Sequence, residues 1–385
     1  MLPNRIGFTP EQDKELFATV PAGPAVFVLR GDNAQAEPYV SKTANLRRRL
    51  QRLLGPVEER TKKLNLRDRV RTIEFTATGS DFESGFLLYL VLRETFPKGY
   101  QKRLRFRLAP FVKLHLENEF PRASITTRLS KRNRPALYYG PFVSRLAAEK
   151  FMNDSLDFFK MRRCIDDLHP DPKFPGCIYS EMKMCLAPCF KGCTDEEYVA
   201  EVKRVQTYFD SRGESLVREL SDQREAASAN LAFEEAATIH VKVEKLQPVV
   251  TPLPEIVQRL DRLYALMIQP SHVPESVALF RIDSGQISGP ITFSIQPPEH
   301  AKSQSMEARI QETLQLLPQS KAKSAVELME HVAILKRWYY RGTRVGEIFF
   351  AAEDVLPMRR IVRGISRVYR GEKPDQQPGN PILPT

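Results

Sequence analysis

Apolar residues in the first hundred positions alternate between short continuous runs and helical spacing. The run at 25–29 (AVFVL), the turn signal RGDN and the extended piece PYV at 38–40 predict a hairpin. Four leucines at helical spacing within 46–54, with arginines between them, predict an amphipathic helix that ends at a Gly-Pro pair. A strand at 70–77 and an apolar helix at 82–95 then complete a β-β-α-β-α unit.

The middle of the chain is less regular at first and then strongly helical. Residues 110–145 carry strand-like pieces and turns. From Thr194, which forms a capping box with Glu197, a long helical pattern extends to about residue 246, and we place a break in it near Asn230. The composition of 248–254 (PVVTPLP) predicts a linker.

The last third of the chain predicts a small mixed unit. A hairpin is expected at 276–295, a helix at 324–340, a strand at 346–350 and a last helix at 356–369. The final fifteen residues contain four prolines and are expected to be disordered.

Charge divides the chain unequally. The whole sequence carries a net charge of +11, from 58 Lys and Arg against 47 Asp and Glu. Residues 1–150 hold 28 basic and 15 acidic side chains, or +13, and the remainder 30 and 32, or −2. Clustered basic residues favour polyanion binding through counterion release, although a well-solvated basic surface explains the charge alone equally well.

Several classes of protein are disfavoured by the sequence. No run of 18 apolar residues occurs, and the first twenty residues resemble no secretion signal, so we expect a cytoplasmic protein without a membrane span. Five cysteines, an odd number without an export signal, argue against a disulfide framework. Four of them lie between Cys164 and Cys189, which leaves a metal site or buried thiols as the choices.

Two motifs near the N-terminus carry a family resemblance. Pro24-Ala25-Val26-Phe27 stands at a P-G-V-Y pattern, and the run from Tyr39 to Arg49 (YVSKTANLRRR) stands at Y-V-G-K-A-x-N-L-R-x-R. With these motifs the chain resembles the N-terminal half of the UvrC family, the nuclease subunit of the bacterial excinuclease, and its GIY-YIG module. The resemblance is strongest over 20–250.

The resemblance implies a nuclease fold in which some of the catalytic residues are replaced. GIY-YIG modules cut a phosphodiester bond with one divalent metal, Mg²⁺ or Mn²⁺, and Tyr39, Lys42 and Arg49 match three of their catalytic residues. Phe27 replaces the first catalytic tyrosine, and Leu88 replaces the metal-binding glutamate. A metal contributes several kcal/mol to transition-state stabilisation, so its loss costs roughly a thousandfold in rate.

No neighbouring carboxylate is expected to substitute at the Leu88 position. On the predicted helix, Glu83 and Glu94 are turned about 140° and 240° away from Leu88. Tyr100 stands at the later asparagine of the family. We therefore expect binding of DNA without cleavage.

The basic side chains that would bind DNA surround these motifs. Residues 42–71 hold 11 basic and 3 acidic side chains, and residues 98–134 hold 11 and 2. The candidate DNA-binding residues are Arg47, Arg48, Arg52, Lys62 and Lys63.

The cysteine spacing matches a second part of the same family. Cys164, Cys177, Cys185 and Cys189 correspond to its cysteine cluster, and Pro188 precedes the last of them. The resemblance implies a [4Fe-4S] cluster held by these four residues. Zinc accepts the same ligands, and buried free thiols are the remaining alternative. Cys193 has no counterpart.

A third motif lies in the helical region. Leu231, Phe233, Glu234, Ala236 and Ala237 match the UVR motif L-x-F-E-x-A-A. The resemblance implies a helical hairpin that pairs with UvrB or another UVR-motif protein. The alternative is an intramolecular hairpin whose Phe233 packs on its own domain.

Together these features predict an α+β protein. We expect a GIY-YIG-like three-stranded sheet with helices at 1–105, a connecting and cysteine-cluster region at 106–200, a UVR-type hairpin at 201–250, a small α+β domain at 251–370 and a disordered tail at 371–385. The favoured function is a UvrC-like nucleotide excision repair protein that binds DNA. The alternatives are an active single-incision endonuclease and a non-catalytic interaction scaffold.

Overall fold

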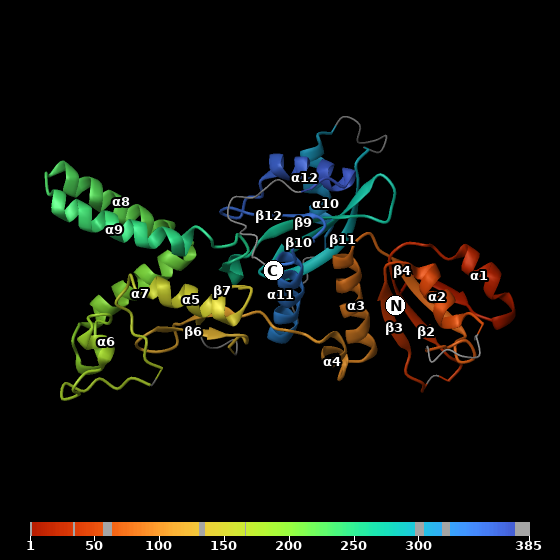
Figure 1. The fold of residues 1–385 in the computed structure, drawn as a ribbon, viewed down its shortest axis with the longest axis horizontal. Helices are drawn as coiled ribbons and strands as arrows, with labels where there is room; N and C mark the ends of the chain where they lie inside the picture. Colours follow the sequence, from red (N-terminus) through yellow and green to blue (C-terminus); the bar gives the residue numbers. More distant parts are fainter. Residues whose placement is uncertain are drawn as a thin grey trace.

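The described residues form an α+β protein built on three four-stranded antiparallel sheets, which confirms the predicted α+β class. The computed structural model describes residues 2–33, 35–56, 64–130, 135–165, 167–296, 304–317 and 324–373. Figure 1 shows an elongated molecule with the N-terminal sheet at one end, the C-terminal sheet in the middle and the middle region at the other end.

The N-terminal sheet has four strands where three were predicted. Its order is β1-β4-β2-β3, from β1 (Asn4–Gly7), β2 (Ala25–Arg30), β3 (Tyr39–Thr43) and β4 (Thr72–Ala77). The strand that the prediction missed, β1, pairs antiparallel with β4. It is mostly exposed and has no apolar alternation, so its sequence gave no signal.

Helices cover both faces of this sheet. A 3-10 turn (Pro10–Gln12), α1 (Asp13–Thr19) and α2 (Leu46–Leu54) lie on one face, where the leucines of α2 are buried. Helix α3 (Asp81–Thr95), capped by the Ser80 hydroxyl, contacts the other face through Leu87, Leu88 and Val91. The predicted helices at 46–54 and 82–95 are confirmed.

Helix α3 also belongs to a second hydrophobic core. Phe82, Phe86 and Tyr89 pack with residues of the middle region and the C-terminal sheet. The ring of Phe82 lies 5.0 Å from that of Phe280 and 5.8 Å from Trp338. One helix therefore joins the N-terminal sheet to the C-terminal domain.

A buried carboxylate strengthens this junction. Glu330 of α11 (Ala325–Tyr339) is 1% exposed and accepts hydrogen bonds from the Tyr89 hydroxyl at 3.0 Å and the Tyr100 hydroxyl at 2.7 Å. The Gln101 amide donates to it at 2.6 Å. Tyr100 begins the short helix α4 (Tyr100–Leu104) and makes an interdomain contact through its bond to Glu330.

The middle region combines a sheet with helices. Its sheet has the order β6-β5-β7-β8 and contains β5 (Phe111–His115), β6 (Arg122–Thr126), β7 (Ala136–Gly140) and β8 (Gln258–Arg259). The helices are α5 (Arg145–Leu156), α6 (Ile178–Glu181), a 3-10 turn (Pro188–Phe190) and α7 (Asp195–Asp210). The predicted capping box of Thr194 and Glu197 begins α7.

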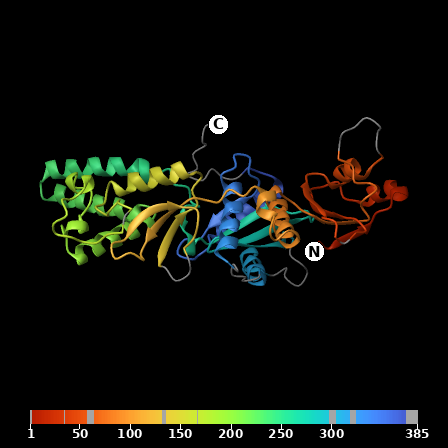
Figure 2. The same ribbon diagram turned by 90° about the horizontal axis from the view of Figure 1, so that it is seen from below.

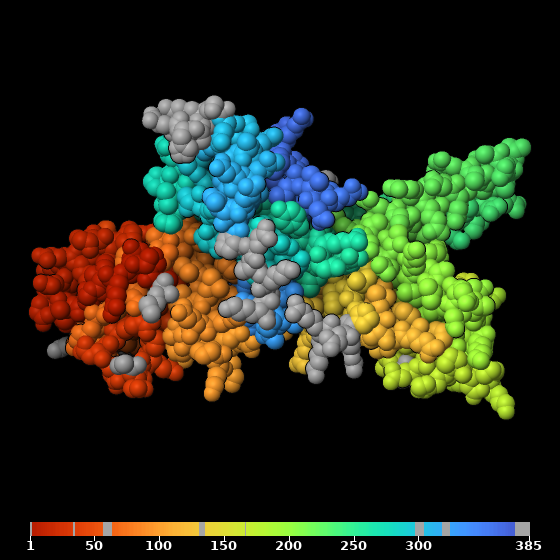
Figure 3. Space-filling model, turned by 180° about the vertical axis from the view of Figure 1, so that it is seen from behind, coloured from red at the N-terminus to blue at the C-terminus, as the bar shows by residue number. Residues whose placement is uncertain are grey.

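Helices α8 (Glu214–Ala229) and α9 (Phe233–Val250) form a hairpin that projects from the rest of the molecule (Figures 1 and 3). The break predicted near Asn230 is confirmed. The predicted linker at 248–254 is wrong in its first half, because α9 continues through Pro248. Val249 and Val250 pack against the large core, and this burial holds the last turn in place.

The C-terminal domain places helices on both faces of its sheet. The sheet order is β11-β10-β9-β12, from β9 (Ala265–Pro270), β10 (Ser276–Asp283), β11 (Gln286–Ser294) and β12 (Glu347–Phe350), and a 3-10 turn (Leu260–Arg262) precedes it. Helices α10 (Met306–Leu316) and α12 (Met358–Arg370) share one apolar cluster with the sheet. Helix α11 packs in the large core, which includes the other sheet face.

The predicted elements of this last domain are confirmed. Figure 2 shows α3 beside the C-terminal sheet and α11. The predicted disordered tail falls mostly on 374–385, outside the described residues. None of the described helices combines the length and apolar character needed to cross a membrane.

Candidate functional site

Strand β3 and helix α2 bring Tyr39 and Arg49 together. The Asn45 side chain caps α2 by accepting a hydrogen bond from a backbone N–H, which starts the helix directly after β3. Arg49 Nη2 donates to the Tyr39 hydroxyl at 2.8 Å. Its Nε is buried without a hydrogen-bond partner among the described residues.

Phe27 lies beside this pair but adds no polar group. Its side chain is fully buried, and its ring centroid is 6.0 Å from that of Tyr39. Both residues pack in the cluster under α2. A phenylalanine here offers apolar contact and no hydroxyl for a water or a metal.

Leu88 belongs to a different cluster. It packs with Val26, Val28 and Val40, under α3. Since side chains alternate along a strand, Val26 and Val28 face away from Phe27. The Tyr39–Arg49 pair and Leu88 thus pack on opposite faces of the sheet.

The carboxylates of Glu83 and Glu74, near Leu88, bind other groups of the protein. Glu83 accepts a hydrogen bond from the backbone N–H of Gly79 at 2.8 Å, and burial raises its pKa above the usual value. Glu74, the cross-strand neighbour of Val28, lies 3.2 Å from the Nε of Arg30. Among the described residues, no three His, Cys, Asp or Glu side chains are placed to hold a metal ion.

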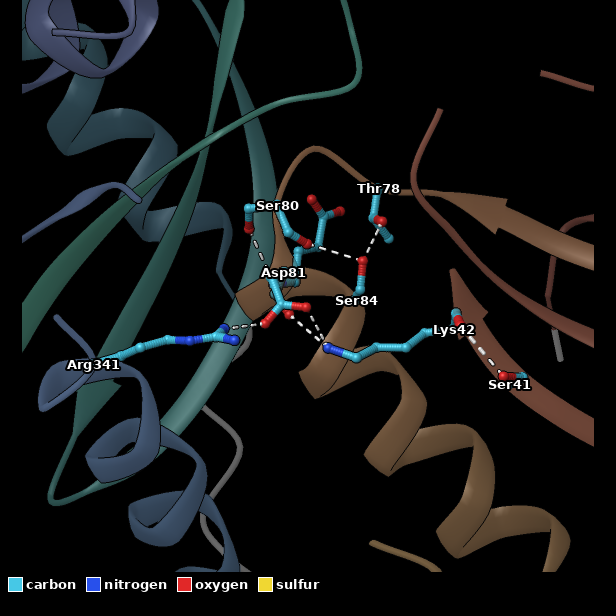
Figure 4. Close-up of polar contacts among 8 residues, drawn as sticks. Ser41, Lys42, Thr78, Ser80, Asp81, Ser84 and Arg341 are labelled. Atoms are coloured by element: carbon cyan, nitrogen blue, oxygen red, sulfur yellow. Dashed lines mark hydrogen bonds and ion pairs between the residues drawn. The ribbon is translucent and has the colours of Figure 1, made fainter. Parts of the chain in front are cut away.

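Lys42 pairs with an acidic residue that the sequence did not single out. Its ammonium binds the Asp81 carboxylate (Figure 4). Arg341, just after the end of α11, donates to the same carboxylate from its Nη1 at 2.6 Å. Partial burial alone would raise the pKa of Asp81, but the hydrogen bonds and charges of Lys42 and Arg341 outweigh it and lower that pKa. No local motif indicates this contact, because Asp81 and Arg341 are 260 residues apart.

The candidate DNA-binding arginines of α2 differ in their contacts: one binds backbone carbonyls, and two are exposed to solvent. Arg47 donates to the carbonyls of Val20 and Ala18 at 2.9 and 3.1 Å, where it closes the end of α1. Arg48 and Arg52 are exposed, and neither guanidinium bonds to another described residue. Lys62 and Lys63 lie outside the described residues.

Four cysteines lie in one neighbourhood in the middle region. Burial, and then the charges of Cys164, Cys189 and Cys177, raise the pKa of Cys185 to about 11. The backbone N–H of Ala187 donates to Cys185 Sγ at 3.3 Å.

Cys164 has a similar donor, since Arg162 Nη1 lies 3.3 Å from its Sγ. Four neighbouring thiols with N–H donors suit a soft metal or an iron-sulfur cluster in chemistry. Among the described residues, these thiols are not placed close enough together to coordinate a metal ion. All five cysteines are free thiols.

The hairpin presents apolar side chains to solvent at its tip. Leu231 is 73% exposed and Phe233 is 64% exposed, so Phe233 does not pack on the rest of the protein. Glu234 and Ala237 are also exposed, and Ala236 is half-buried. Leu231 has a positive φ of 60°, which turns the chain between α8 and α9.

Comparison with known proteins gives the chain its relatives. Residues 109–208 match the family described as UvrC/Cho excinuclease, middle domain. No solved structure matches the chain.

Three curated relatives illustrate the similarity, and each is a UvrABC system protein C. That of Carboxydothermus hydrogenoformans is 29% identical over 242 residues, which are 61% of this chain and 38% of the relative. That of Rickettsia bellii is 28% identical over 291 residues, 73% and 43% of the two chains. That of Alcanivorax borkumensis is 28% identical over 256 residues, 66% and 41%.

The matched part of the chain thus spans less than half the length of these relatives. The described geometry and the comparisons agree in one respect: the middle domain, with its four neighbouring cysteines, lies inside the matched region. The chain is UvrC-like, and its residues 109–208 match the middle domain of the excinuclease family.

Proposed function

We propose that the protein takes part in nucleotide excision repair as a UvrC-like DNA-binding protein that does not cut DNA. The observation that carries this proposal is the state of the N-terminal site. Tyr39 and Arg49 are paired there, but the adjacent Phe27 supplies no hydroxyl, and Leu88, which packs on the opposite face of the sheet, supplies no carboxylate.

Binding and cutting depend on different groups in such a site. Arg48 and Arg52 provide exposed positive charge, which attracts phosphates at any sequence. Cutting needs a metal or an activated water at the phosphate, and a metal alone is worth several kcal/mol. Of the described carboxylates near Leu88, Asp81 is bound to Lys42 and Arg341, and Glu74 is paired with Arg30.

Titration of a labelled duplex at several salt concentrations tests the binding. The logarithm of the affinity should fall linearly with the logarithm of the salt concentration, and a double Arg48→Glu, Arg52→Glu variant should reduce the slope by roughly 2. Arg359→Glu with Arg363→Glu, two exposed α12 positions, is the matched control. Absence of salt-dependent binding by the wild-type protein would refute the proposal.

The hairpin is proposed as the contact with UvrB or another UVR-motif protein. Phe233 is a large apolar side chain in solvent next to exposed Leu231, and aromatic anchors of this kind dominate protein interfaces. Figure 3 shows that the hairpin is free of the body along most of its length, so a second hairpin can reach it.

We expect Phe233→Ala to weaken UvrB binding by about 2 kcal/mol, roughly thirtyfold in Kd, because the anchor is lost. Isothermal calorimetry with purified UvrB measures the change. Val199→Ala is the matched control, since Val199 is 59% exposed on α7, away from the hairpin. Equal Kd values for Phe233→Ala and the wild-type protein would contradict the assignment.

We further propose that Cys164, Cys177, Cys185 and Cys189 hold an iron-sulfur cluster. A bound cluster would supply a rigid cross-link between segments of the middle region. It would also require the thiols to lose their protons, which the raised pKa values of Cys185 and Cys189 oppose in its absence.

Protein purified without oxygen should contain about four iron atoms per chain and absorb visible light. Cys185→Ser should abolish both signals, because it removes a ligand. Cys193→Ser should keep them, since Cys193 packs beside the large core and matches no ligand position. Zinc in place of iron would favour the zinc alternative, and iron retained in Cys185→Ser would contradict the ligand assignment.

A further inference from the structure

A cleft lies where α3, the segment after α4 and α11 meet. Its volume is about 530 Å³. Three separate parts of the chain line it: Lys42 and Asp81 from the N-terminal unit, Arg105 and Arg107 from the connecting segment, and the end of α11. The cleft is thus shared by the N-terminal and C-terminal domains.

The polar lining of this cleft is almost entirely cationic. Its basic members are Lys42, Arg105, Arg107, Lys336, Arg337 and Arg341. Asp81 is the single acidic residue that lines it among the described residues, and it pairs with only two of these cations, Lys42 and Arg341.

The other four cations have no counter-charge of their own. Arg105, Arg107 and Arg337 are exposed, and Lys336 is half-buried. None of the four side chains forms a hydrogen bond or an ion pair with another described residue. Burial and, after it, repulsion from the Arg107 guanidinium lower the pKa of Lys336. An anion in the cleft would relieve this repulsion.

The floor of the cleft is apolar and includes the remnant nuclease position. Leu88, which replaces the metal-binding glutamate, lines the cleft beside Tyr89 and Phe106. Trp338 of α11 lines it as well and is the only tryptophan of the chain. The position that a nuclease would use for a metal therefore faces a row of cations contributed mainly by other segments.

We propose that this cleft binds the phosphate backbone of a DNA strand and that α11 of the C-terminal domain provides part of the phosphate contacts. The proposal rests on the DNA binding proposed above and assigns a second, separate binding surface to it. Arg48 and Arg52 lie on α2, on the opposite face of the N-terminal sheet from Leu88.

Extended backbone suits this cleft better than one small anion. Six cations from three segments exceed what a single phosphate group can contact. Arg337 lies in the last turn of α11 and Arg341 just beyond its end, so the two cations can contact successive phosphates of one strand. Arginine and lysine contacts of this kind position a strand without reading its sequence.

The binding of a labelled oligonucleotide to the full chain tests the proposal in three variants. Lys336→Glu with Arg337→Glu should weaken binding roughly tenfold or more at 100 mM salt, since two phosphate contacts are lost. Asp81→Asn should strengthen binding, because Lys42 and Arg341 are released for the strand. This gain cannot come from misfolding. Arg359→Glu with Arg363→Glu, on the opposite face of the C-terminal sheet, should leave binding within twofold.

The fluorescence of Trp338, which lines the cleft, reports whether the oligonucleotide binds there. Oligonucleotide bound in the cleft should change its fluorescence, and the change should be lost in the Lys336→Glu, Arg337→Glu variant. If that variant binds as the wild type does while Arg48→Glu with Arg52→Glu weakens binding, the cleft proposal is wrong and DNA binding through α2 stands. If no variant or wild-type protein binds DNA, both proposals fail. An α12 variant as weak as the α11 variant would also overturn the cleft as the specific site.

Discussion

Replacing Glu330 by Ala is expected to destabilise the junction between α3 and α11 by about 3 kcal/mol. The substitution removes the acceptor of three hydrogen bonds, from the hydroxyls of Tyr89 and Tyr100 and the amide of Gln101. Tyr89 is fully buried, so its hydroxyl would lose its carboxylate partner where water does not replace it. The cost of an unsatisfied buried donor adds to the loss of the bonds themselves.

Urea unfolding followed by the fluorescence of Trp338 measures this change, because Trp338 lies on the same helix as Glu330. Glu312→Ala is the matched control, since Glu312 is exposed on α10, and its effect should stay within about 0.5 kcal/mol. Equal unfolding midpoints for the two variants would show that the Glu330 contacts do not hold the junction.

The second large effect concerns catalysis. The wild-type protein should show no metal-dependent cleavage of duplex DNA, because a cost of about 4 kcal/mol corresponds to roughly a thousandfold loss of rate. Two groups are missing together, the hydroxyl at Phe27 and the carboxylate at Leu88. Tyr39 and Arg49 alone can orient a phosphate, but neither holds a divalent metal.

Local patterns predicted the elements whose core contacts are close in sequence. The leucine spacing of α2 and the cap of α7 each specify their helices, and both are confirmed. Strand β1 escaped prediction because it is an exposed edge strand, stabilised by pairing with β4 rather than by an apolar face. Helix α9 continues through Pro248 because of tertiary burial, which overrides the local preference of proline.

In the candidate site, too, contacts between residues close in sequence could be predicted and long-range contacts could not. The Tyr39–Arg49 pair could be predicted, since β3 and α2 are adjacent in sequence. The cleft could not, because Asp81 and Arg341 meet only when α3 packs on α11. Arg105 and Arg107 were visible as charge, but only the fold shows that they share a cleft with Lys336 and Arg337.

The same long-range packing explains the position of Tyr100. The family resemblance matches this position to an asparagine of the nuclease module. In the structure its hydroxyl donates to Glu330, so the residue supports the junction between domains.

Incubation of the purified chain with damaged duplex DNA and Mg²⁺ or Mn²⁺, with binding followed in the same samples, tests the central claim most directly. The account predicts salt-dependent binding and no incision over the time in which an active excinuclease completes the reaction. Incision by the wild-type protein that is abolished by Tyr39→Phe or Arg49→Ala would contradict it.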